Sequence, residues 1–145
     1  MLILIWSLSM IAMILGLFIA CGDKITDTAD DSVENPYTNN PATFTEVNDE
    51  LLMKSCAFSS CHAVAAGYLL LEEEGNYTRL VDIASFTLTD EILVVPNDAD
   101  SSYLFKKVIG AEGIAGDIMA PNGAGISLLQ EQMLRSWIED GAQNN

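Results

Sequence analysis

One short stretch, residues 56–62, constrains the fold of this 145-residue chain more than any other. It reads Cys-Ala-Phe-Ser-Ser-Cys-His, and His62 is the only histidine in the sequence. In a continuous α-helix the side chains of Cys56 and Cys61 would point about 140° apart. A single planar prosthetic group could therefore bind both sulfur atoms only if residues 57–60 leave the helix. We therefore predict a helix that ends near Cys56 and a loop between the two cysteines.

Two thiols followed directly by an imidazole suit covalent attachment of a haem. The thiols add across the porphyrin vinyl groups, and the adjacent histidine becomes an axial ligand of the iron. The common spacing is C-x-x-C-H, whereas four residues separate the cysteines here. Two other interpretations stay open. One is a Cys56–Cys61 disulfide with His62 at the surface, and the other is a zinc site that still needs a fourth ligand.

Charge and size narrow the classes of protein further. Six Lys and Arg residues stand against 21 Asp and Glu residues, which gives a net charge of −15 at pH 7. Such a surface does not attract nucleic acid or anionic lipid headgroups. One domain of modest size buries a limited core, to which a covalently held cofactor would add apolar contacts.

The first segment is expected to direct export. Residues 2–20 are apolar and uncharged, and small Ala20 precedes Cys21. This pattern resembles a bacterial lipoprotein signal, residues 1–20, with lipid attachment at Cys21. It departs from that pattern at Phe18, where Leu is commoner, and no Lys or Arg precedes the apolar run. The alternative is an uncleaved transmembrane anchor. In either case the rest of the chain meets an oxidising compartment.

The organisation after the signal follows from composition and pattern. Residues 21–42 are acidic and rich in Thr and Asn, so we expect a flexible tether with little to bury. Residues 43–145 are expected to form the domain. Capping boxes and helical spacing predict helices from Thr43 to near Cys56, around Tyr77–Val81, from Ser101 to about Ile109 with Asp98 or Asp100 as cap, and from Ser127 to Gly141. An extended segment, 88–95, is expected to close at Pro96.

Four motifs, taken in order, resemble one known family. They are the Ser55-Cys56…Cys61-His62 site, the Tyr77…Leu80-Val81 segment, the run V-V-P-N-D-A-D-S-S-Y-L-F-K-K-V at 94–108, and a Met near a Pro followed by W-I-E-D-G-A at 137–142. The third is similar to "V-P-G-D-P-x-x-S-Y-L-x-x-K" and the last to "W-I-x-x-G-A". Residues 54–142 thus resemble small monohaem c-type cytochrome domains of exported bacterial proteins, including planctomycete- and myxobacterium-type cytochromes.

The resemblance implies an all-α, c-type cytochrome-like fold with about four short helices around one covalently bound haem c. It implies thioether bonds from Cys56 and Cys61, with His62 as proximal and Met119 as distal ligand of the haem iron. A thioether ligand favours ferrous iron and raises the reduction potential. It also implies that Trp137 packs against the first helix and shields the haem edge.

The distal ligand departs from the family pattern. Ala120 separates Met119 from Pro121, whereas the family usually has Met directly before Pro. An ordinary loop or core methionine is the alternative interpretation of Met119. Lys106 and Lys107 are alternative distal ligands, although an amine is protonated unless it is buried.

The function expected from this resemblance is one-electron transfer, by a carrier and not an enzyme. The protein would be lipid-anchored on the periplasmic or cell-surface side of a bacterial membrane. Its partners would be other redox proteins that dock near an exposed haem edge through a small interface, and no small-molecule substrate is required. An open distal position would instead suit a peroxidase-like enzyme. The alternative from another class is a haem-free interaction lipoprotein stapled by a Cys56–Cys61 disulfide.

Overall fold

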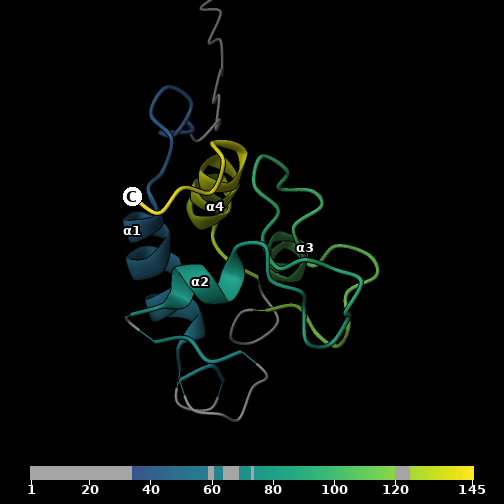
Figure 1. Ribbon diagram of the computed structural model, residues 1–145. Coiled ribbons are helices and arrows are strands. Elements are labelled where there is room, and N and C mark those ends of the chain that lie inside the picture. Colours follow the sequence, from purple (N-terminus) through teal and green to yellow (C-terminus); the bar gives the residue numbers. More distant parts are fainter. Residues whose placement is uncertain (1–33, 59–60, 64–68, 73, 120–124) are drawn as a thin grey trace, which may run out of the picture. The chain divides into compact units, whose positions relative to one another are not determined.

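The computed structural model describes residues 34–58, 61–63, 69–72, 74–119 and 125–145 (Figure 1). They fall in one unit, residues 33–145. The expected signal segment, its lipidated Cys21 and most of the expected tether lie outside these ranges. Within them the regular secondary structure is helical and no strand forms, so the expected all-α class is confirmed at this level. No helix in the described ranges is long and apolar enough to cross a membrane.

The first helix begins at its predicted capping box. Helix α1, Phe44–Val47, starts after Thr43, whose side-chain oxygen accepts the N–H of Glu46 over 3.2 Å. The Glu46 carboxylate in turn accepts the Thr43 N–H over 2.8 Å. Two of the N–H groups that a helix start leaves without partners are therefore satisfied by residues in the local sequence.

Helix α1 runs directly into η1, Asn48–Cys56, which has π-helical hydrogen bonding. The N–H of Ala57 donates to the carbonyl of Leu52 over 2.8 Å, an i to i+5 bond that closes the last turn. The chain then turns, with the Phe58 N–H donating to the carbonyl of Cys56 over 2.9 Å. The predicted end of the helix at the first cysteine is confirmed.

The three other predicted helices are also present. They are α2, Asn76–Leu80; α3, Tyr103–Ile109; and α4, Leu128–Glu139. The second capping box is present, since the Ser127 side chain accepts the Gln130 N–H over 3.2 Å. Gly141 follows the end of α4 with φ +93°, a left-handed conformation that suits glycine.

The predicted cap of α3 is wrong. The Asp98 carboxylate accepts the N–H of Ser101 over 2.9 Å, before the helix begins, and Ser102 occupies the N-cap position. The Ser102 hydroxyl is fully buried and accepts the N–H of Val95 over 2.9 Å. The Ser102 hydroxyl also donates to the carbonyl of Asp98 over 2.7 Å, so its side chain bonds to the preceding segment and not to its own helix.

The segment between α2 and α3 is extended without forming a sheet. Isolated bridges pair Val81 with Val94 and Ala84 with Ile92. The buried Val94 anchors this segment to the core, and its N–H donates to the carbonyl of Leu80 over 3.1 Å.

Helix α4 packs against both α1 and α3 and forms the centre of the core. The ring of Phe44 on α1 lies 5.4 Å from Trp137 and 5.3 Å from Tyr77, measured between centroids. The expected contact between Trp137 and the first helix is thus confirmed. Among the described residues, the apolar side chains that are fully buried are Val47, Leu51, Leu52, Leu80, Val94, Phe105, Leu134, Ile138 and Ala142.

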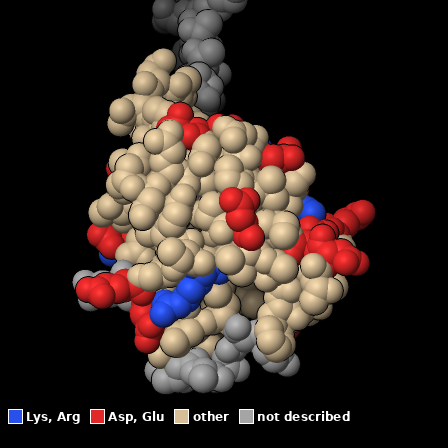
Figure 2. Space-filling model, in the orientation of Figure 1, with Lys and Arg blue, Asp and Glu red and all other residues tan. Residues whose placement is uncertain are grey.

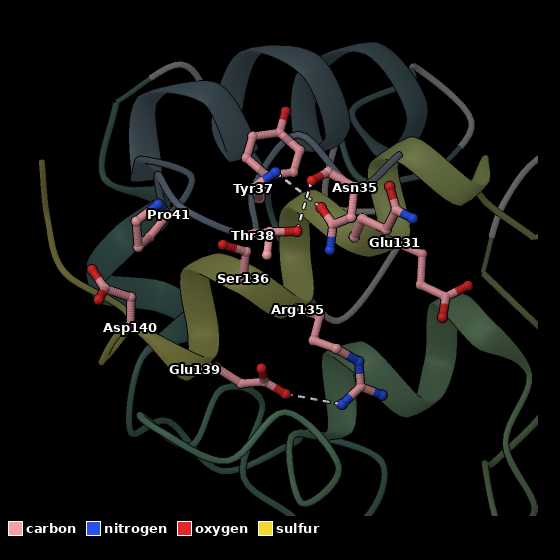
Figure 3. Close-up of a pocket in the computed structure, with 10 residues that line it drawn as sticks. Asn35, Tyr37, Thr38, Pro41, Glu131, Arg135, Ser136, Glu139 and Asp140 are labelled. Atoms are coloured by element: carbon pink, nitrogen blue, oxygen red, sulfur yellow. Dashed lines mark hydrogen bonds and ion pairs between the residues drawn. The ribbon is translucent and has the colours of Figure 1, made fainter. Parts of the chain in front are cut away.

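Residues 34–42, which were expected to be part of the tether, lie along α4. Tyr37 packs against the core, and Ala42 is 2% exposed. Figure 3 shows the polar groove that results, about 430 Å³ in volume, with Asn35 and Thr38 facing α4. Its one cation, among the lining residues described, is Arg135, which donates to Asp100 over 2.9 Å and to Glu139 over 3.0 Å.

Candidate functional site

A largely apolar cavity of about 340 Å³ is lined by both residues that the sequence predicts as ligands of the haem iron. Both His62 and Met119 line it, although 56 residues of sequence lie between them. The volume lies within the range of pockets that bind cofactors and other small molecules. The other described lining residues are Leu69, Arg79, Ile83, Ala84, Ser85, Phe86, Thr87, Leu93, Tyr103, Leu104, Lys107 and Ala115.

The ring of His62 is oriented by its own loop. Its Nδ1 lies 2.6 Å from the carbonyl oxygen of Leu69. A carbonyl oxygen only accepts hydrogen bonds, so Nδ1 carries a proton, and in the neutral ring Nε2 carries the lone pair. The backbone is held as well, because the N–H of Leu71 donates to the His62 carbonyl over 2.8 Å. Fixing one ring nitrogen through a backbone carbonyl is the usual way in which proteins orient a metal-ligating histidine.

Met119 reaches the cavity from the loop that follows α3. Its N–H donates to the carbonyl of Lys107 over 2.9 Å, and its side chain remains 40% exposed. The expected neighbour Pro121 lies outside the described residues.

The two cysteines are beside His62 in the sequence but are not among the described lining residues. Cys56 is a partly buried thiol that packs against the core, whereas Cys61 is exposed. Burial raises the pKa of Cys56 to about 11, and the charge of Cys61 adds to this effect.

The two alternative distal ligands are held by oxygen atoms. The Lys106 ammonium pairs with Glu91 over 2.7 Å. The Lys107 ammonium donates to the carbonyl of Ala115 over 2.9 Å and to that of Asp117. An ammonium in such contacts has no lone pair for a metal. A zinc site was the other interpretation left open. The described residues hold no group of three or more His, Cys, Asp or Glu side chains that could bind a metal ion.

Several wall residues were not singled out from the sequence. Tyr103 is one of them, and it lies one turn before Lys107 on α3, a spacing visible in the sequence once α3 is known. Ile83 and Phe86 are exposed apolar residues in a polar loop, 41% and 69% exposed. Phe86 stands between Ser85 and Thr87, and an aromatic residue in so polar a context is the signal that could have found it. Trp137 is absent from the described lining residues, so the expected shielding role gains no support.

No family model, curated protein or solved structure matches the chain. The geometry of this cavity and the motifs of the sequence are therefore the basis for assigning a function.

Proposed function

We propose that the protein is a membrane-tethered monohaem c-type cytochrome that carries single electrons at the bacterial envelope. The observation that supports this proposal best is one largely apolar cavity that both His62 and Met119 line. An imidazole and a thioether are the pair of axial donors found in cytochromes c. The four-part sequence resemblance gives the same ligand pair independently.

Each candidate residue suits a role toward the haem. Cys56 and Cys61 would hold it through thioether bonds, and the hydrogen bond from His62 to Leu69 leaves Nε2 as the donor nitrogen. Met119 would supply the second axial donor. When bound, the haem supplies a centre that gains or loses one electron while both axial ligands stay in place.

The cavity wall would tune this centre. Leu69, Leu93 and Leu104 exclude water from part of the wall, and a drier environment disfavours the more highly charged ferric form. The thioether of Met119 acts in the same direction because a soft sulfur donor favours ferrous iron. Both effects raise the reduction potential.

The charge of the chain bears on its partners. Figure 2 shows acidic side chains over the visible face and little basic surface. With a net charge of −15, the protein would associate with redox proteins that carry a basic docking surface, through a small and transient interface. Lipid attachment at Cys21 and an acidic tether would keep the domain near the membrane.

The test is chemical. The full chain is expressed with a c-type maturation system, denatured, reduced in pyridine and scanned for the absorption of haem c. We expect a haem c spectrum that stays with the polypeptide through acid–organic extraction. Cys56→Ala and Cys61→Ala should each remove a thioether bond, and Cys21→Ala is the matched control, since it should leave haem attachment intact and abolish lipid anchoring.

The contrary result has a clear meaning. A protein without haem, in which Cys56 and Cys61 are oxidised to each other, would exclude electron transfer by this domain. The remaining explanation would be that the protein is a haem-free interaction lipoprotein, stapled by this disulfide.

A further inference from the structure

Helix α3 holds the loop that carries Met119 through two side chains on one face. Tyr103 is 3% exposed, and its phenolic oxygen accepts the N–H of Ala115 over 3.0 Å. Lys107, one turn later, is 6% exposed and contacts the same loop. Both residues also line the cavity, so the loop is attached to its wall at the place where Met119 enters.

Lys107 makes three hydrogen bonds to alternate residues of the loop. Its ammonium donates to the carbonyls of Ala115, over 2.9 Å, and Asp117. Its backbone carbonyl accepts the N–H of Met119 over 2.9 Å. A buried ammonium is costly unless it is hydrogen-bonded, so Lys107 requires these carbonyls.

Packing against the end of α3 also holds this loop. Gly110 ends α3 with φ +71°, which reverses the chain direction. A Cβ on Gly110 would lie 2.9 Å from Cδ1 of Ile118, so Ile118 rests directly on the helix backbone. The residue before Met119 therefore also contacts the end of α3.

We propose that Lys107, assisted by Tyr103, is a positioning residue that holds Met119 at the cavity and so determines whether this methionine ligates the haem iron. The ligation part rests on the proposed haem function, whereas the attachment of the loop does not. Lys106 is the natural contrast, because the side chain of this adjacent lysine pairs with Glu91 over 2.7 Å.

The experiment compares Lys107→Met with Lys106→Met, two equal changes in charge and shape. Hydrogen exchange is followed at the Ala115 and Met119 amides, with and without haem. In the loaded protein the weak red absorption band of methionine-ligated ferric haem and the reduction potential are recorded. For Lys107→Met we expect exchange at least about tenfold faster, loss of the band and a lower potential, with haem still attached. Lys106→Met should leave all three unchanged.

Tyr103→Phe is the milder variant should Lys107→Met unfold. It removes one acceptor oxygen and should speed exchange at Ala115 more than at Met119. Unchanged exchange in folded Lys107→Met or Tyr103→Phe would overturn the attachment, and unchanged band and potential would overturn the positioning role. If the wild-type chain binds no haem, the proposed function and the ligation part fail together, while faster exchange in Lys107→Met still supports the attachment of the loop.

Discussion

The side-chain amide of Asn76 donates to Oδ1 of Asn48 over 2.8 Å, with both residues buried. This bond joins the first residue of α2 to the first residue of η1. On its other side Asn76 accepts the N–H of Glu72 over 2.9 Å. Glu72 ends the short described segment that begins at Leu69, whose carbonyl orients His62. The buried asparagine pair therefore anchors the segment whose Leu69 carbonyl orients His62.

Replacing Asn76 with Ala should destabilise the domain by about 2–4 kcal/mol, because it leaves the Glu72 N–H and the Asn48 side chain without their partner. Urea unfolding followed by circular dichroism measures the change. Asn39→Ala is the control, since Asn39 is exposed, and it should change stability by less than about 0.5 kcal/mol. Equal effects of the two variants would contradict the structural role of Asn76.

Ser127→Ala should cost about 1 kcal/mol of stability, because it removes the oxygen that accepts the Gln130 N–H at the start of α4. The same substitution removes the Ser127 hydroxyl that donates to the Gln130 side chain over 3.1 Å. That side chain in turn donates to the carbonyl of Glu50 and to Ser55, each over 2.9 Å. Thermal unfolding compares it with Thr89→Ala at an exposed site. A melting temperature as high as that of Thr89→Ala would show that the cap contributes nothing.

Local signals in the sequence predicted the helices well. Both capping boxes are short-range patterns, and the structure realises each one where Thr43 and Ser127 stand. The end of η1 near Cys56 was predicted from helix geometry together with the expectation that both cysteines bind one group, which a continuous helix would not allow.

Long-range features could not be predicted in the same way. The cap assigned to Asp98 was wrong because Ser102 is buried by tertiary packing, and sequence patterns do not report which hydroxyl a distant N–H needs. The packing of Tyr37 and Ala42 against the core has the same origin, as the surrounding residues are polar. The wall residues of the cavity come from separate segments that only the folded chain brings together.

In the haem-free protein Cys56 should react slowly with iodoacetamide at pH 8, roughly 100-fold more slowly than in the urea-denatured chain. Burial raises its pKa from 9.0 to about 11, so the reactive thiolate is scarce until the pH approaches that value. Mass spectrometry of the labelled peptide measures the rate. Equal rates in the folded and denatured chains would contradict this environment.

The same shift predicts how stability depends on pH. A thiol with a raised pKa binds its proton more tightly in the folded state, so its contribution is complete below pH 9 and is lost as the pH rises toward 11. In the haem-free protein, unfolding free energies of the wild type should fall faster over this interval than those of Cys56→Ala. Parallel curves for the two proteins would show that Cys56 is not responsible.

Met119→Ala should leave haem attachment intact and open the distal position. Cys56, Cys61 and His62 are unchanged, so the covalent haem signal should persist, while the loss of the thioether should lower the reduction potential and allow carbon monoxide to bind the ferrous protein. Met133→Leu is the matched control, because Met133 is 2% exposed in the core and is absent from the cavity wall described here. Spectroelectrochemistry measures both variants. An unchanged potential and spectrum in Met119→Ala would remove Met119 from the ligand set.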